Sequence, residues 1–185
     1  IIKNADLKFG ISLMAIGFFK KMFFADNISP LVNNIFSNPI GMESFSIILG
    51  AIAFGVQIYC DFSGYSDIAI GAAAILGFKI PLNFNKPFFA TSPSDYWTRW
   101  HISLSTWVRD YLYYPLVFKH RRSSIMVFSC LLASMLVMGL WHGASWNFVI
   151  WGGLHGIFLA LFTVLRKKYG KSTESFFKTN YGKIS

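Results

Sequence analysis

A stretch of 43 residues, from Ser123 to Leu165, contains no Asp, Glu, Lys or Arg. Since about 20 apolar residues cross the hydrocarbon core of a bilayer as a helix, this stretch is long enough to cross twice. Basic residues lie on both sides of it, at 119–122 and 166–168, and such residues favour the cytoplasmic side. The pattern predicts a helical hairpin whose two ends face the cytoplasm and whose turn is Trp141 to Asn147.

The composition is also that of a membrane protein. Hydrophobic residues make up 54% of the chain and charged residues 14%, whereas soluble domains carry roughly 25% charged residues. A net charge of +9 would suit nucleic acid in a soluble chain, but here the basic residues cluster at the ends of apolar segments, where anionic headgroups lie. We therefore expect the lipid bilayer as a partner and no nucleic acid. Cys60 and Cys130 lie in apolar surroundings and are expected to be buried thiols.

Two apolar segments precede the hairpin. Phe9 to Ala25, interrupted by two lysines, predicts one helix that stops at Asp26 and Asn27, before Pro30. Residues 29–43 contain two prolines and three asparagines and are expected to form a loop with a short helical turn. The segment from Ser44 to Cys60 is uncharged for 17 residues, which is the lower limit for a membrane crossing.

Asp61 and Asp67 follow this segment directly. The apolar sequence resumes at Ile68 but lasts for only 11 residues, too few to cross a membrane. We expect either a half-helix or a continuation of the preceding helix past a break at Gly64. Either would place both aspartates inside the protein, where broken helices are tolerated if they are buried or line a cavity. Both aspartates are therefore candidates for lining or bracing a substrate path, and capping of a helix is the alternative for Asp67.

An irregular connection is expected over residues 81–93, which include three prolines. After it, Ser94 and Asp95 are expected to cap a helix that runs to about Tyr113 and is ended by Pro115. Its charges and tryptophans are typical of an amphipathic interfacial helix or of one that lines a polar cavity. On such a helix Trp97, His101 and Ser105 share one stripe, and Asp95 and Arg99 pair at i, i+4. Arg109 and Asp110 are further candidates for the substrate path.

Three histidines have distinct expected roles. His142 lies within the uncharged stretch, where an ionisable residue suggests a functional site, although a hydrogen bond that pins two helices is an equal alternative. Its neighbours Trp141 and Asn147 are supporting candidates. His101 is expected to point into a pocket, with a backbone hydrogen bond at the interface as the alternative. His155 lies among glycines on the return helix, on a different helical face from the one that His142 would meet. It is expected to take part in helix packing. The histidine spacing does not predict a metal site.

These features predict an all-α, polytopic integral membrane protein fragment with transmembrane helices, short broken or re-entrant helices and an amphipathic interfacial helix. The chain begins at Ile1 without an initiator Met or a signal-peptide pattern. We therefore expect residues 1–185 to be one partial domain whose N-terminal part, and also a C-terminal part, is missing.

Four motifs occur in a characteristic order. They are YCDFSGYSDIAIG (59–71), NFNKPF (83–88), YWTRWHISLSTWVRDYLYYPL (96–116) and LWHGASWNFVIWGGLHG (140–156). They resemble those of the membrane-bound O-acyltransferase family, and within it the branch of bacterial alginate O-acetyltransferases. The D-alanyl transfer proteins of teichoic acid modification are similar more distantly. One departure is Val117 and Phe118, which stand where alginate-type members commonly have a glycine pair.

The resemblance implies a multi-pass acyltransferase of the bacterial inner membrane. Such a protein moves an acyl group, here expected to be acetyl, from a cytoplasmic thioester to hydroxyls of an extracellular polysaccharide. Acetyl-CoA or another acyl thioester would be the donor substrate, and no bound cofactor is expected. The acyl group could also pass to periplasmic or membrane-anchored acetyltransferase partners. The alternatives are D-alanyl transfer to teichoic acid, a membrane transporter, or a structural subunit of a polysaccharide secretion complex.

The resemblance also implies residue roles. His142 matches the family's essential histidine and His101 its second polar position. A neutral imidazole at His142 would act as general base. The oxyanion could be bound by backbone N–H groups of Gly143 and Ala144, by the indole N–H of Trp141 or Trp146, or by His101 if it is protonated. A covalent route through Ser145 or Ser103 is the alternative, although no nucleophile-elbow pattern is present.

Overall fold

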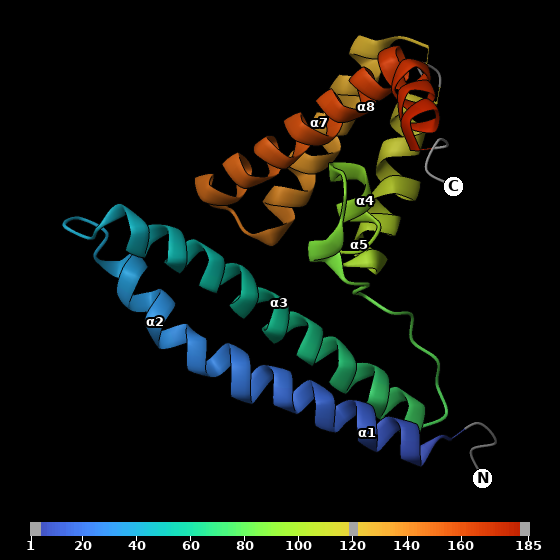
Figure 1. Ribbon diagram of the computed structural model, residues 1–185. Helices are drawn as coiled ribbons and strands as arrows, with labels where there is room; N and C mark the ends of the chain where they lie inside the picture. Colours follow the sequence, from blue (N-terminus) through green and yellow to red (C-terminus); the bar gives the residue numbers. More distant parts are fainter. Residues whose placement is uncertain (1–4, 119–121, 182–185) are drawn as a thin grey trace. The chain divides into compact units, whose positions relative to one another are not determined.

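The computed structural model describes residues 5–118 and 122–181 (Figure 1). These residues form helices and no strand, which confirms the all-α prediction. The chain divides into two compact units, residues 1–83 and 84–185, and each is described separately. Within the described residues, three helices are long and apolar enough to cross a membrane: Ser44–Ile75, Ser124–His142 and Trp146–Tyr169.

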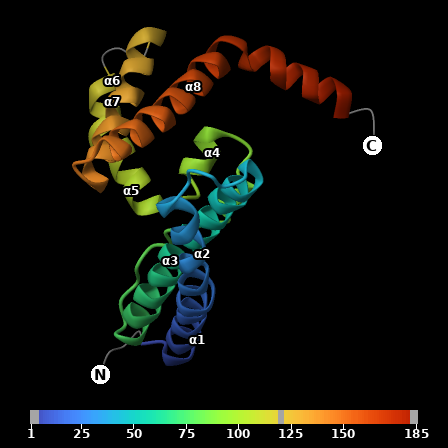
Figure 2. The same ribbon diagram turned by 90° about the vertical axis from the view of Figure 1, so that its left-hand side faces the viewer.

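The first unit is an antiparallel pair of helical rods. The segments α1 (Leu7–Phe18), η1 (Phe19–Ala25, a π-helix) and α2 (Asp26–Ser37) form one rod, and α3 (Ser44–Ile75) returns beside it, as Figures 1 and 2 both show. Glycines bring the two backbones into contact. A Cβ on Gly10 would lie 2.6 Å from the carbonyl oxygen of Gly71, and one on Gly17 would lie 2.6 Å from that of Gly64. Close backbone approach at small residues is a common way to pair apolar helices.

Two boundaries expected in this unit are wrong for the same reason. The first rod continues through Pro30 to Ser37, because Val32 and Ile35 are buried and packing outweighs the missing backbone N–H of the proline. The expected loop therefore shrinks to residues 38–43. The helix α3 passes Gly64 without a break, because that glycine provides the contact with Gly17 instead of a kink.

The second unit contains the predicted hairpin. The helices α7 (Ser124–His142) and α8 (Trp146–Tyr181) are joined by residues 143–145. This confirms the hairpin, but the turn is shorter than the expected Trp141 to Asn147, because the helices include both ends of that span. Part of the preceding basic cluster, Lys119 to Arg121, lies outside the described residues. Val127, Cys130 and Leu131 of α7 are buried with Ala160 of α8. Cys60 and Cys130 are both free, buried thiols, as predicted.

Short helices precede the hairpin. They are the 3₁₀ segment η2 (Pro87–Phe89), α4 (Pro93–Trp97), α5 (Ile102–Trp107), the π-helix η3 (Val108–Tyr113) and α6 (Tyr114–Val117). The single helix expected from Ser94 to Tyr113 is thus wrong. It is interrupted at residues 98–101, where His101 has a left-handed backbone with φ of 42°. The N-cap is Ser92, and Pro115 is tolerated in the first turn of α6, where its missing N–H costs little.

Candidate functional site

His142 occupies the last position of α7, directly before the turn to α8. Its imidazole is surrounded by aromatic rings. The ring centroid lies 5.0 Å from Trp141, 5.2 Å from Trp151 and 6.0 Å from Phe148. Within the described part of the chain no hydrogen bond reaches this imidazole, so the expected alternative of a hydrogen bond that pins two helices is not what the structure has.

His101 lies near the same group of rings although it comes from a different element. Its ring centroid is 6.4 Å from that of Trp141, which also contacts His142. Burial is the main cause that lowers the pKa of His101 below its usual value, and the nearby His142 lowers it further. At neutral pH His101 is therefore an uncharged imidazole. The structure thus brings the two predicted histidines to the same indole, that of Trp141.

The left-handed backbone at His101 produces this placement. Residues other than glycine adopt such a conformation rarely, and it costs roughly 1 kcal/mol or more. Because the helix is interrupted here, Trp97, His101 and Ser105 do not form the continuous helical stripe expected from their spacing. Ser105 is used locally, since its hydroxyl donates to the carbonyl of Trp100 at 2.9 Å.

Trp151 is a site residue that sequence reasoning missed. Its ring lies 5.2 Å from His142 and 4.8 Å from His155, and it also contacts Trp97 at 6.0 Å. His155 packs α8 against α4 through Trp97, at 5.3 Å. This agrees with the expected packing role of His155, although the expectation did not include the indole that touches both histidines. The i, i+4 spacing of Trp151 and His155 was the available signal.

The turn between α7 and α8 offers one unused backbone donor. The N–H of Gly143 donates to the carbonyl of Leu140 at 3.2 Å, and that of Ser145 donates to the carbonyl of Gly143 at 2.8 Å. Within the described residues, the N–H of Ala144 has no hydrogen-bond acceptor. Asn147 is the second residue of α8, and its N–H donates to the hydroxyl of Ser145 at 3.4 Å.

A cavity of about 370 Å³ lies in the same unit. Its walls come from α4, α5, η3, α6, α7 and α8, and the predicted residues Trp97, Ser105 and Arg109 line it. Neither histidine lines the cavity, but Ile102 beside His101 and Met138 one turn before His142 both do. The cavity thus reaches the immediate neighbours of both histidines.

Three hydroxyls of this cavity already donate their protons to backbone carbonyls. Ser134 donates to the carbonyl of Cys130 at 2.7 Å, and Thr163 donates to that of Leu159 at 2.8 Å, as Ser105 does to Trp100. A hydroxyl that donates to a carbonyl keeps lone pairs for accepting a hydrogen bond. These three hydroxyls can therefore act as acceptors between apolar side chains such as Leu131 and Met135.

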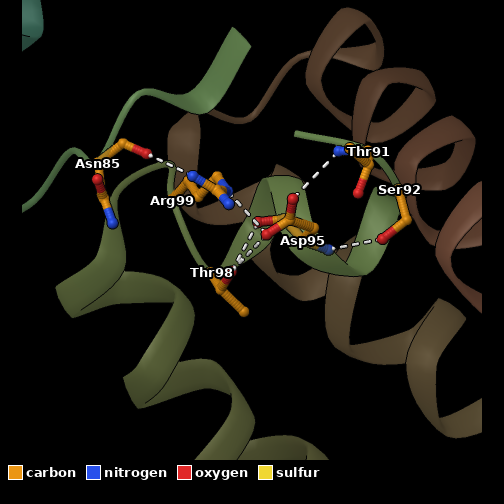
Figure 3. A network of polar contacts seen from close by, with 6 residues as sticks. All are labelled: Asn85, Thr91, Ser92, Asp95, Thr98 and Arg99. Carbon is orange, nitrogen blue, oxygen red and sulfur yellow. Dashed lines mark hydrogen bonds and ion pairs between the residues drawn. The ribbon is translucent and has the colours of Figure 1, made fainter. Parts of the chain in front are cut away.

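Asp95 organises the entrance to α4 (Figure 3). Its carboxylate accepts from Arg99 Nε at 2.7 Å and from the backbone N–H of Thr91 at 3.1 Å, so the predicted i, i+4 pair is confirmed. Arg99 also donates to the carbonyl of Asn85 at 3.4 Å. The hydrogen bond from Arg99 is the main cause that lowers the pKa of Asp95. Arg99 thus braces the segment that carries His101.

The other charged candidates form ion pairs. Arg109 Nε lies 2.8 Å from Asp110 Oδ1 on η3. In the first unit, Lys20 Nζ lies 2.6 Å from Asp67 Oδ2, and Lys21 pairs with Asp61. These two pairs join the rods of that unit, so the aspartates have a bracing contact there. Among the described residues no three His, Cys, Asp or Glu side chains come together as a metal site would require.

Residues 3–182 match the family model described as MBOAT, the membrane-bound O-acyltransferase family. The chain belongs to this family. The match covers nearly the whole sequence, including both histidines and the cavity.

Individual relatives agree with this membership. A protein described as a probable alginate O-acetylase of Azotobacter vinelandii is 47% identical over 152 residues, which are 81% of this chain and 30% of the relative. The peptidoglycan O-acetyltransferase of Helicobacter pylori is 37% identical over 92% of this chain and 32% of its own length. The teichoic acid D-alanyltransferase of Bacillus subtilis is 33% identical over 88% of this chain and 43% of its own length. The chain therefore spans about a third of the curated relatives it matches.

Proposed function

We propose that the full-length protein is an O-acyltransferase that moves an acetyl group from a thioester donor to a hydroxyl acceptor. Family membership supports the acyl transfer, and the similarity to relatives named O-acetylase and O-acetyltransferase favours acetyl as the group. The observation that carries the proposal is the meeting of His101 and His142 at Trp141. Two imidazoles from separate elements at one place supply both a base and a hydrogen-bond donor.

In the proposed reaction His142 is the general base. An alcohol has a very high pKa, so its attack on a thioester carbonyl requires that its proton leave as the new bond forms. The imidazole of His142 takes that proton, the hydroxyl oxygen bonds to the carbonyl carbon, and the tetrahedral intermediate then expels the thiolate. The proton on His142 can return to the leaving sulfur, so the base is regenerated in each cycle.

The oxyanion of the intermediate needs preorganised donors. The N–H of Ala144 is favoured because it has no acceptor within the described residues, while those of Gly143 and Ser145 are already used. A neutral His101 still carries one ring N–H and can supply a second donor. The covalent route through Ser145 or Ser103 receives less support, because Ser145 is bonded within the turn.

The donor and acceptor are proposed to lie on opposite sides of the membrane. Acyl thioesters such as acetyl-CoA are cytoplasmic, while the polymers after which the relatives are named lie outside the cell. The protein would therefore act as a relay in the bacterial inner membrane. The final acceptor is then either a polysaccharide hydroxyl or a periplasmic or membrane-anchored acetyltransferase partner. The three apolar helices support a multi-pass arrangement.

Two alternatives to acetyl transfer can be distinguished from it by experiment. Similarity to the teichoic acid D-alanyltransferases favours D-alanyl transfer as the second candidate. A transporter or a structural subunit of a polysaccharide secretion complex would also accommodate polar residues at membrane depth. Only an acyltransferase requires the proton-accepting ring of His142 for a covalent product.

The test measures acetyl groups on the extracellular polysaccharide of cells that carry the full-length protein. His142→Ala is expected to abolish acetylation at unchanged membrane abundance. His155→Phe serves as the matched control, because it replaces another histidine of the hairpin by a ring that keeps the aromatic contacts. Acetylation that persists in His142→Ala would reject His142 as the base, and D-alanyl esters in place of acetyl esters would select the second candidate.

A further inference from the structure

The orientation of His142 rests on aromatic contacts. A histidine that acts as a base is usually oriented by a hydrogen bond from its second ring nitrogen to a carboxylate or a carbonyl. Within the described residues His142 has no such bond. Three rings surround it instead. They contribute unequally to the orientation of the imidazole, because two of them, Trp141 and Phe148, are 63% and 39% exposed.

Trp151 is the ring whose own position is fixed. It lies on α8, beside Gly152, where the backbones of the hairpin touch. A Cβ on Gly152 would lie 2.5 Å from the carbonyl oxygen of Met135 and 3.1 Å from Cα of Gly139. Gly139 precedes His142 by three residues, so this contact sets the distance between the helix that carries His142 and the helix that carries Trp151.

A second layer of rings also contacts Trp151. Trp97 of α4 meets it at 6.0 Å with an interplanar angle of 78°, and His155 meets it at 4.8 Å. His155 is held in turn by Trp97 and by Tyr96, which stacks on it at 6.3 Å. Edge-to-face and offset arrangements of this kind are favourable ring geometries. The indole therefore contacts both Trp97 of α4 and the imidazole of His142.

We infer that Trp151 is a positioning residue that holds the imidazole of His142 in the orientation needed for proton transfer. Its ring meets that imidazole edge-to-face, at 85°, and it takes the place of a polar partner, which the histidine does not have among the residues that the structure describes. The inference rests on the proposed function, because it assigns Trp151 a role only through His142. A misplacement of a reacting group by about 1 Å can cost about 100-fold in rate.

The experiment uses membrane vesicles from cells that express the full-length protein, with acetyl-CoA as the donor and unacetylated polysaccharide as the acceptor. The rate per amount of protein is measured at varied acetyl-CoA. Trp151→Leu is expected to lower kcat about 10- to 100-fold with KM for acetyl-CoA within about twofold. Trp151→Phe, which restores a ring, is expected to recover at least about a third of the wild-type kcat. The matched control Trp107→Leu, whose ring meets Tyr111 and is 56% exposed, is expected to leave both constants unchanged.

Several results would overturn the inference. These are a wild-type kcat in Trp151→Leu, equal kcat values in the Leu and Phe variants, or a rise in KM with unchanged kcat. If the Leu variant is absent from the membrane, Trp151→Met replaces it, and equal kcat values for Met and Phe again overturn the role. His142→Ala in the same vesicles distinguishes a failure of the proposed function from a failure of the positioning role of Trp151. Activity that persists there rejects the proposed function, whereas an inactive His142→Ala with an active Trp151→Leu rejects the positioning role alone.

Discussion

Lys20 Nζ lies 2.6 Å from Asp67 Oδ2 and joins the two rods of the first unit, with side chains 29% and 16% exposed. Beside this pair, a Cβ on Gly64 would lie 2.7 Å from the carbonyl oxygen of Gly17 and 3.2 Å from Cβ of Lys20. The glycine contact brings the backbones close enough for the two charged side chains to meet. Charges that would be costly alone in an apolar hairpin are thus neutralised as a pair.

Removal of Asp67 is expected to destabilise the first unit. Asp67→Ala leaves the Lys20 ammonium without its carboxylate, at a cost between the roughly 1 kcal/mol of exposed pairs and the roughly 3 kcal/mol of buried ones. Asp61→Ala is the comparison, and a smaller loss is expected because the side chains of Lys21 and Asp61 are 41% and 50% exposed. The free energy of unfolding of the purified full-length protein, titrated with denaturing detergent, measures both.

A charge exchange completes this test. The double variant Lys20→Asp with Asp67→Lys is expected to recover most of the lost stability, because it restores an ion pair in the reverse sense. If Asp67→Ala retains wild-type stability but loses acyl transfer, the aspartate lines the substrate path instead of bracing the rods.

The glycine contact in the second unit predicts that substitutions at two adjacent positions have very different effects on stability. A Cβ at Gly152 would meet the carbonyl oxygen of Met135 at 2.5 Å, whereas one at Gly153 would lie 3.6 Å from the end of the Leu136 side chain. Gly152→Ala is therefore expected to push the hairpin apart and to cost about 1–3 kcal/mol. Gly153→Ala is expected to be tolerated. Thermal unfolding in detergent micelles distinguishes them, and equal melting temperatures would contradict the contact.

The sequence was sufficient for the parts of the fold that depend on composition and periodicity. The absence of charge from Ser123 to Leu165 predicted the hairpin α7 and α8, and the i, i+4 spacing predicted the pair of Asp95 and Arg99. The errors occurred where tertiary contacts outweigh local preference. Gly64 suggested a break because glycine weakens an isolated helix, but the neighbouring rod requires its missing side chain.

The sequence indicated the residues of the candidate site better than it indicated how those residues are arranged. The motifs identified His101 and His142, but local spacing placed His101 on a continuous helix that the structure interrupts. Trp151 was missed because its role depends on how α8 packs against α7, which no local pattern contains. A left-handed residue other than glycine is also difficult to predict, since the surrounding fold imposes it.

The backbone at His101 allows its structural and chemical roles to be separated. With φ of 42°, this position accepts Gly or Asn at little cost, whereas a β-branched residue is strained there. His101→Gly is expected to preserve the fold but to lower acetyl transfer, and His101→Val is expected to lose about 1–2 kcal/mol of stability as well. His101→Asn keeps an N–H donor and is expected to retain more activity than His101→Gly. Equal activity of the Gly and Asn variants would argue against a donor at this position.

The lowered pKa of His101 predicts a stability that depends on pH in a defined direction. Burial is the larger cause and the neighbouring His142 the smaller. Both favour the neutral imidazole and therefore lower the pKa of His101 below its usual value of 6.5. Between the folded pKa and 6.5 the unfolded chain binds more protons than the folded chain does. The contribution of His101 is therefore complete above about pH 6.5 and decreases as the pH falls toward the folded pKa.

A variant of the neighbouring histidine tests the cause directly. His142→Gln removes the second charge while burial remains, so the pKa of His101 is expected to rise but to stay below 6.5. Titration of isotope-labelled histidine by NMR in micelles of the full-length protein measures this shift. His155→Gln is the matched control and is expected to leave the pKa of His101 unchanged, because burial and His142 are the causes that lower it. An unchanged or lowered pKa in His142→Gln would mean that the two imidazoles do not interact and that Trp141 separates them into independent sites.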